Sequence, residues 1–253
     1  MAEKIISPGV FTNEIDQSFL PSAVADIGAA IVGPTLKGPA GIPTVVTSFS
    51  DFQAKFGDVV KKMNGFVRSL VAENLENKEV SKTLARVKKY EDITDRIEQD
   101  VADYLTKVSQ GEMSENSSIK VRGMLSIVGD LERIGDIYYQ MSKGLERKIE
   151  GKVYFTPEQR KNILDMFDLV ELNLTTMCGN LEGSYGGVSM LKAQEQEDAL
   201  NKFRKTLRKE HFASVEKGYY NFKSAAIYAD LFNSLEKVGD HVINVTEGIT
   251  GEH

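Results

Sequence analysis

The feature that most constrains this chain is an internal repeat. Residues 131–136 read Leu-Glu-Arg-Ile-Gly-Asp, and residues 235–240, which follow 104 positions later, read Leu-Glu-Lys-Val-Gly-Asp. The similarity extends upstream, where residues 91–97 align with residues 197–203 at an offset of 106 positions. A repeat of this kind indicates that one supersecondary unit is used twice. The chain is therefore expected to fold as two related halves.

Each half of the repeat carries acidic residues in pairs. A Glu and an Asp four positions apart lie on one face of a helix, about one turn from each other. Like charges at this spacing repel, so a cation between them would relieve the repulsion. Each half is predicted to contain two acidic helices. The pairs are Glu91 and Asp95, Glu132 and Asp136, Glu236 and Asp240, and finally Glu197 with Asn201 in place of an Asp.

From about residue 60 onward, apolar side chains recur with the spacing of amphipathic helices. The pattern predicts six helices, grouped as three and then three. The one proline of this region, Pro157, stands at a predicted helix start, where Thr156 and Gln159 have the spacing of a capping box. Further breaks are predicted at residues 183–187 and at Gly218, because glycine interrupts the helical pattern there.

The first 58 residues differ in composition from the rest. Five of the six prolines lie within the first 43 residues. Each proline fixes φ and removes a backbone donor, so the prediction here is irregular chain with short strands. A brief helix is predicted to begin at Ser50 or Asp51 and to end at Gly57. The predicted domains are therefore residues 1–58, 59–152 and 153–253.

Composition excludes several classes of protein. The net charge of −6 argues against nucleic acid as the main partner, because a phosphate backbone attracts a basic surface. The single cysteine, Cys178, excludes an intrachain disulfide and a cysteine-based zinc site. Neither a signal peptide nor an apolar run long enough to span a bilayer is recognisable, so a cytoplasmic protein is expected. No pairing of a catalytic nucleophile with a base is visible, and no enzymatic turnover is expected.

The acidic motifs at residues 91–95, 132–136 and 236–240 resemble those of the PhoU family of phosphate-signalling proteins. Residues 239–247 are similar to the cytoplasmic PhoU-like tail of bacterial sodium/phosphate cotransporters. The resemblance covers the chain from about residue 60 to its end. It implies an all-α fold of two tandem three-helix bundles, preceded here by an irregular N-terminal arm.

A second resemblance concerns that N-terminal arm. Residues 7–10, 13–16 and 31–34 look like the N-terminal arm of contractile phage tail sheath proteins. In that family the arm links neighbouring subunits by strand addition. The alternative function is therefore a structural, sheath-type assembly protein, and an artificial fusion of the two proteins is a further alternative.

For the acidic motifs, the functional hypothesis is a metal site. Carboxylates on facing helices suit Mg²⁺, Mn²⁺ or iron. The family resemblance implies a divalent or iron-type metal ion held by both halves, with the second half weakened because the amide of Asn201 brings no charge. The alternative interpretation is a solvated acidic face, with Arg133 and Lys237 as local partners. The hypothetical ligands are Glu91, Asp95, Glu132, Asp136, Glu197, Asn201, Glu236 and Asp240.

Other side chains are assigned less specific roles. His211, His241 and His253 are expected at the surface or at helix caps, and His241 is the one to test as a ligand because it follows Asp240. Cys178 is expected in the core. The predicted function is a metal-binding regulatory module of phosphate uptake or signalling. Its expected partner is a phosphate transporter or a sensor kinase, with membrane contact only through that partner, and a homo-oligomer is compatible with this function.

Overall fold

The structure is a computed structural model that describes residues 49–72, 77–109, 114–182, 188, 190–219 and 221–251. Within these residues the chain forms six helices and no strand. The predicted all-α fold is confirmed. The predicted strands and the first 48 residues of the predicted arm (residues 1–58) lie outside the described part, and the last ten residues of that arm belong to the first helix. The helices are α1 (Phe49–Ala72), α2 (Asn77–Ser109), α3 (Glu115–Glu150), α4 (Pro157–Glu182), α5 (Met190–Glu216) and α6 (Phe222–Thr250).

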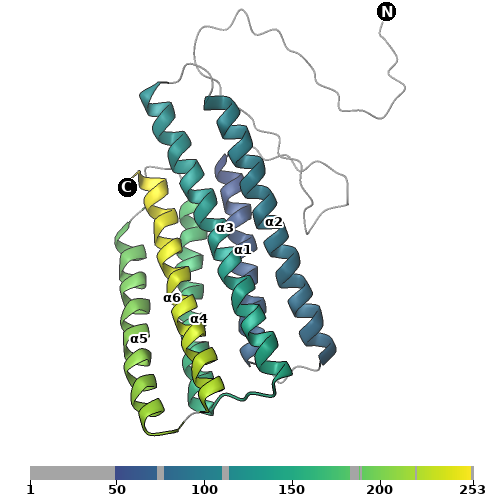
Figure 1. Cartoon of the computed structure of the whole chain (residues 1–253). Helices are drawn as coiled ribbons and strands as arrows, with labels where there is room; N and C mark the ends of the chain where they lie inside the picture. The colour runs from purple at the N-terminus through teal and green to yellow at the C-terminus, as the bar shows by residue number, and fades with distance from the viewer. Residues whose placement is uncertain are drawn as a thin grey trace, which may run out of the picture.

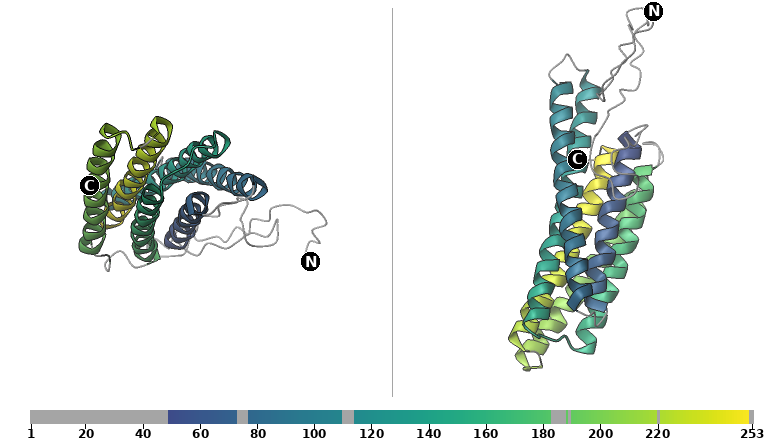
Figure 2. Two further views of the ribbon diagram at one scale, coloured as in Figure 1. Left: turned by 90° about the horizontal axis from the view of Figure 1, so that it is seen from below. Right: turned by 90° about the vertical axis from the view of Figure 1, so that its right-hand side faces the viewer.

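The six helices form two groups of three that lie side by side along one long axis (Figures 1 and 2). In the first group α1, α2 and α3 pack against one another, and in the second α4, α5 and α6 do the same. The groups meet where α3 packs along α6 and α1 packs along α4. Buried apolar side chains from all six helices belong to one continuous core. The two predicted three-helix bundles are therefore present, and they share their hydrophobic core.

Local sequence signals account for several helix ends. At the start of α4 the backbone N–H of Thr156 donates to Gln159 Oε1 at 3.0 Å, and the N–H of Gln159 donates to Thr156 Oγ1 at 3.1 Å. This is the reciprocal pattern of a capping box, as predicted. The predicted break at Gly218 is also confirmed, since this residue has a φ of 70° between α5 and α6. The predicted break at residues 183–187 lies outside the described residues.

The prediction of a short helix ending at Gly57 is wrong. α1 runs from Phe49 to Ala72 without interruption, so the domain boundary predicted between residues 58 and 59 lies inside a helix. Gly57 packs against α4, where a Cβ atom would lie 3.1 Å from Leu181 Cδ1 and 3.2 Å from Cys178 Sγ. Cys178 is itself buried, as predicted. The glycine therefore serves close helix packing rather than helix termination.

The glycine of each repeated acidic motif also lies at a close contact between helices. A Cβ atom at Gly135 of α3 would lie 2.7 Å from Thr94 Oγ1 of α2. A Cβ atom at Gly239 of α6 would overlap Leu200 Cδ2 of α5. Thr94 and Leu200 occupy equivalent positions of the repeat. In both halves, the same glycine lets the two acidic helices approach each other.

We expect the substitution Gly135→Ala to lower the free energy of unfolding by about 1–3 kcal/mol through overpacking. The added methyl group would collide with Thr94, which is fully buried and, being β-branched, cannot easily rotate away. Gly144→Ala on the same helix is the matched control, because a Cβ atom there meets nothing within 4 Å. That control should gain up to about 1 kcal/mol from helix propensity. Denaturant titration measures both, and equal effects would contradict the close contact.

Candidate metal centre

Three carboxylates from two helices converge at the contact between α2 and α3. Glu91 and Asp95 come from α2 and Asp136 from α3, and one carboxylate oxygen of each lies within 4.8 Å of the others. Glu91 is buried and Asp95 is half-buried. Metal ions bind carboxylate oxygens at about 2.0–2.6 Å, so a single ion between the three could contact all of them. We call these three residues, together with Glu132 of α3, the first cluster.

The fold itself sets the spacing of these carboxylates. Thr94 and Gly135, which form the close contact between α2 and α3, are the immediate sequence neighbours of Asp95 and Asp136. The point where the helices come nearest is therefore also the point where the acidic side chains meet. On each helix, the acidic partner lies one turn away on the same face.

The electrostatics of the first cluster favour a bound cation. Burial, followed by repulsion from Asp136, raises the pKa of Asp95. Burial likewise raises the pKa of Glu132 to about 7, with further contributions from Asp136, Asp95 and Glu98. Asp95 Oδ1 is buried and accepts no hydrogen bond from the residues that the structure describes. A buried acceptor among like charges is costly unless a cation neutralises it.

One protein cation lies at the edge of the first cluster. Lys88 Nζ is 2.5 Å from Glu91 Oε2 and 2.9 Å from Asp92 Oδ1, and its side chain is about half exposed. It satisfies one carboxylate of the cluster and leaves an excess of negative charge around Asp95, Glu132 and Asp136. The remaining donors are hard oxygen ligands, which fit Mg²⁺, Mn²⁺ or iron and do not fit soft metals.

The equivalent residues of α5 and α6 form a second cluster, in which protein side chains offset part of the negative charge. Asn201 Nδ2 donates a hydrogen bond to Glu197 Oε1 on α5. The guanidinium of Arg204 forms an ion pair with Glu236 of α6, and both of these side chains are largely buried. Burial raises the pKa of Glu197 and of Asp240, and repulsion from Asp240 adds to the shift at Glu197 while repulsion from Glu236 adds to the shift at Asp240. Here a protein side chain supplies the cation.

Sequence reasoning anticipated part of this difference from Asn201, but it missed Arg204 and Glu98, although the repeat contains them. At the offset of 106 positions, Asn201 aligns with Asp95, and one turn later Arg204 aligns with Glu98. Glu98 adds to the repulsion at Glu132 in the first cluster, whereas Arg204 neutralises Glu236 in the second. Extending the alignment by a single helical turn would have identified both residues. Their pairing across helices, however, depends on the packing of α5 against α6.

Of the eight predicted ligands, the structure brings together four in each half. Among the described residues, Glu91, Asp95 and Asp136 form the set of possible metal ligands that lie within reach of one ion. Glu132 stands beside them and interacts electrostatically with Asp136 and Asp95. The four residues of the other half, Glu197, Asn201, Glu236 and Asp240, gather around Arg204 and do not form such a set.

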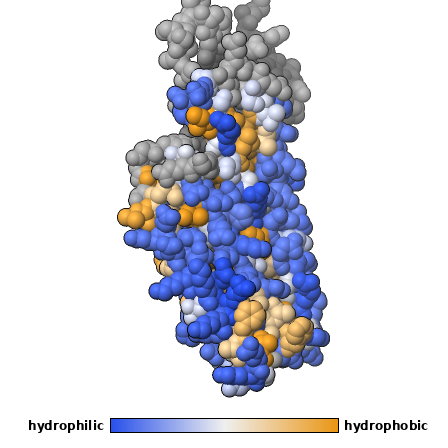
Figure 3. Space-filling model, turned by 60° about the vertical axis from the view of Figure 1, so that its left-hand side comes forward, coloured by the Kyte–Doolittle hydropathy of each residue, from blue (hydrophilic) through white to orange (hydrophobic). Residues whose placement is uncertain are grey.

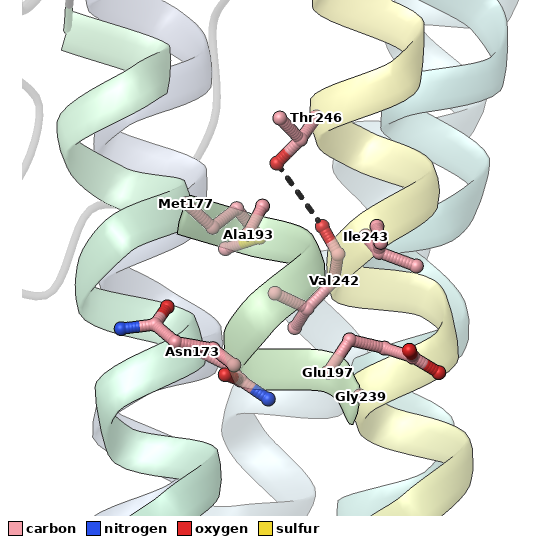
Figure 4. A pocket seen from close by; sticks show the side chains of 9 residues that line it. Asn173, Met177, Ala193, Glu197, Gly239, Val242, Ile243 and Thr246 are labelled. Carbon is pink, nitrogen blue, oxygen red and sulfur yellow. Dashed lines mark hydrogen bonds between the residues drawn. The ribbon is translucent and has the colours of Figure 1, made fainter. Parts of the chain in front are cut away.

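A small cavity lies beside the second cluster, between α4, α5 and α6 (Figure 4). Its volume is about 10 Å³, close to the minimum that holds one water molecule. The cavity is lined by the side-chain amide of Asn173 and by Gln196 Oε1, which are buried and have no hydrogen-bond partner within the described part of the chain. A single bound water would satisfy these polar atoms, but the space excludes a small-molecule ligand.

The two described histidines do not join the first cluster. His241 Nδ1 lies 2.8 Å from Asp130 Oδ1 of α3, and Asn244 Nδ2 donates to the same oxygen at 3.4 Å. His241 therefore contributes to the contact between α3 and α6. The expectation that His211 lies at the surface or at a cap is wrong, because it is buried and its ring packs against Tyr228 and Phe232. His253 lies outside the described residues.

Comparison with known proteins identifies the fold. The family model of the PhoU domain matches residues 56–144, which run from α1 into α3 and include the first cluster. The chain has a PhoU-like fold. The structure is similar to the crystal structure of PhoU from Pseudomonas aeruginosa, with a TM-score of 0.60 and 16% identity, covering 79% of this chain and 93% of that chain. No curated protein matches the sequence. Within the described residues, no helix of this PhoU-like fold has the length and apolarity that crossing a bilayer demands.

We expect the stability of the metal-free protein to fall as pH rises from about 4.5 to about 7. The pKa of Glu132 is raised from 4.5 to about 7, so the folded state binds more protons than the unfolded state in this window, and stability decreases with pH. Glu132→Gln should flatten the decrease, while Glu195→Gln at an exposed position of α5 should preserve it. Denaturant titrations in the presence of a chelator measure the slope, and identical slopes for parent and Glu132→Gln would contradict this assignment.

Proposed function

We propose that this protein is a metal-binding regulatory module of phosphate uptake or signalling, which acts by contacting a transporter or a sensor kinase. The observation that carries the proposal is the first cluster, placed within a region that matches the PhoU domain. The role is regulation by protein contact rather than enzymatic turnover. The metal is a divalent or iron-type ion with a preference for oxygen ligands.

The argument for metal begins with charge. Glu91, Asp95 and Asp136 present oxygens within 4.8 Å of one another, and the neighbouring Glu132 has its pKa raised to about 7. Carboxylates that repel one another in a partly buried site favour either protonation or a bound cation. A multivalent cation fits better than a second lysine, because a metal ion can contact all the carboxylates from a single central position.

The same reasoning assigns the metal to the first cluster and not to the second. Arg204 already forms an ion pair with Glu236, and Asn201 hydrogen-bonds Glu197. A metal entering the second cluster would have to displace a partly buried guanidinium from its carboxylate. The proposal therefore narrows the sequence-based hypothesis, which gave both halves a metal, to one site between α2 and α3.

Metal binding would act on the fold through the contact between these two helices. The ligands Glu91 and Asp95 belong to α2 and Asp136 to α3, so a bound ion ties the helices together near the close contact of Thr94 and Gly135. A ligand that binds only the folded arrangement stabilises it by mass action. Occupancy could in this way alter the surface that α2 and α3 present to a partner.

We expect Mg²⁺, Mn²⁺ or Fe²⁺ to stabilise the protein by about 2–3 kcal/mol when the ion is present at about 100 times its Kd. Asp136→Asn should abolish most of this gain, because it removes a charged ligand while keeping its shape. Asp240→Asn, the equivalent change in the second cluster, should retain the gain and is the matched control. Thermal unfolding of chelator-treated protein with and without added metal measures the effect.

A reciprocal design tests whether Arg204 excludes metal from the second cluster. Asn201→Asp combined with Arg204→Glu makes this half match the residues of the first cluster at both positions. The double variant should lose stability without metal and regain it with metal, and elemental analysis should show added metal relative to the parent. A parent protein that gives no response to metal, or an Asp136→Asn variant that responds fully, would overturn the metal assignment.

The regulatory part of the proposal predicts a change in phosphate uptake. In cells lacking this protein, uptake of labelled phosphate should fail to decline when external phosphate is ample, and expression of the parent chain should restore the decline. Asp136→Asn should restore it less well than Asp240→Asn if metal occupancy matters for contact with the partner. Unchanged uptake in cells lacking the protein would reject the phosphate role while leaving the metal site testable in vitro.

A further inference from the structure

One end of the molecule exposes a group of aromatic side chains. It is the end at which α3 connects to α4 and α5 turns into α6, the lower end in Figure 1. Exposed fractions there are high: 83% for Phe222, 75% for Tyr154, 69% for Tyr219 and 54% for Phe212. Figure 3 shows a group of apolar side chains at this end, in addition to apolar patches nearer the other end of the same face. We call this end, defined by these four residues, the aromatic tip.

The contributing segments are held close to one another. Ser224 Oγ, in the first turn of α6, donates a hydrogen bond to the backbone carbonyl of Tyr154 at 3.1 Å. Phe212 lies in the last turns of α5, which ends at Glu216, and Phe222 begins α6. The turn is tight, since the backbone N–H of Tyr219 donates to the carbonyl of Ser214 at 3.0 Å. The aromatic side chains thus protrude from a connected, hydrogen-bonded surface.

The same end of the molecule is strongly basic. Residues 143–161 and 205–223, which span the last turns of α3 and α5, the first turns of α4 and α6 and the two connections between them, contain eleven Lys and Arg against five Asp and Glu. The chain as a whole has a net charge of −6. Charge is therefore divided along the long axis, with the basic side chains around the aromatic tip and the acidic excess elsewhere.

Basic and aromatic side chains alternate within the tip. The guanidinium of Arg208 lies 5.7 Å from the ring centroid of Phe212, and Lys217 Nζ lies 5.9 Å from that of Tyr219. Lys223 directly follows Phe222 at the start of α6. On such a surface, the aromatic rings can insert between the molecules of a binding partner. The neighbouring cations can then pair with negatively charged groups of that partner.

We propose that the aromatic tip docks directly on the surface of an anionic lipid bilayer. Aromatic rings settle at the level of lipid headgroups, and each Lys or Arg near an anionic surface strengthens binding by about fivefold. The headgroup region of a bilayer is fluid and can accommodate rings that protrude from different segments of the chain. A rigid protein partner would need a groove that matches their arrangement. This inference does not depend on the metal site. It differs from the sequence-based expectation, in which the protein reaches the membrane only through a partner, because here the protein binds the bilayer itself.

Docking in this way would orient the molecule. The basic tip would face the bilayer, and the acidic excess, including the first cluster between α2 and α3, would be kept away from anionic headgroups by like-charge repulsion. The long axis of the molecule would then point out of the membrane plane rather than lie along it. In this orientation the surfaces of α2 and α3 remain open to a partner at the membrane.

The test is flotation of the full chain with lipid vesicles. We expect binding to vesicles of phosphatidylcholine with about one third phosphatidylglycerol, and at least about tenfold weaker binding to phosphatidylcholine alone. Raising the salt concentration to about 0.5 M should release most of the protein, because exposed charges are then screened. The variant Phe222→Ser with Lys223→Glu should bind about tenfold or more weakly, since it removes a ring and reverses a charge.

The matched control is Leu191→Ser with Lys192→Glu, which makes an equivalent change at the other end of the second group of helices. Leu191 is 68% exposed and Lys192 is exposed beside it, near the start of α5. This control should bind vesicles as the parent does. The tip variant keeps the helix cap, because Asn221 accepts from the backbone of residue 223 rather than from its side chain. Circular dichroism verifies that both variants fold.

Two outcomes would overturn the proposal. The parent chain may fail to float with anionic vesicles, in which case a protein surface is the better candidate for the tip. Alternatively, the tip variant and the control may bind equally, which would place lipid binding elsewhere on the chain. Neither outcome bears on metal binding, so the inference and the proposed function can fail separately.

Discussion

The organisation of this protein depends on the close approach of paired helices at the glycine of a repeated motif. Gly135 against Thr94 brings α3 to α2, and Gly239 against Leu200 brings α6 to α5. A Cβ atom at Gly135 would collide with the fully buried, β-branched Thr94, whereas the overlap at Gly239 involves the terminal methyl group of Leu200. Because an acidic residue follows each glycine, the packing contact also brings carboxylates together. The same contact thus sets both the shape of each bundle and the spacing of its charges.

Carboxylates that lie close together repel one another, and the two halves of the protein reduce this repulsion in different ways. In the second half, Arg204 and Asn201 supply a cation and a hydrogen-bond donor from within the chain. In the first half, Glu98 and Asp95 occupy these positions, and Lys88 reaches only the edge of the cluster. The repeated unit therefore contains one cluster that is partly neutralised from within the chain and one that keeps a larger excess of negative charge.

Charge is also distributed unevenly along the molecule. Basic and aromatic side chains gather at the tip, on the helix ends and the connections between them, whereas the acidic clusters lie farther along the helices. A net charge of −6 hides this polarity. The net charge of the whole chain argues against nucleic acid as a partner. It does not predict how one end of the molecule interacts with a charged surface. The proposed membrane contact and the proposed metal site use separate regions of the molecule.

The sequence by itself determined the helical class, the repeat and the acidic faces. Amphipathic periodicity predicted the helices, and the capping box of Thr156 and Gln159 placed the start of α4, because these signals depend on residues close together in the chain. Sequence also supplied the PhoU resemblance, which the family match at residues 56–144 supports. It could not determine the role of Gly57, which by local rules ends a helix and in fact packs against Leu181 of α4. Only the tertiary structure decided which carboxylates meet, that Arg204 pairs with Glu236, and that His211 is buried against Tyr228. These outcomes depend on contacts between residues far apart in sequence. The identity of a residue alone does not specify which distant residue will pack against it in the folded protein.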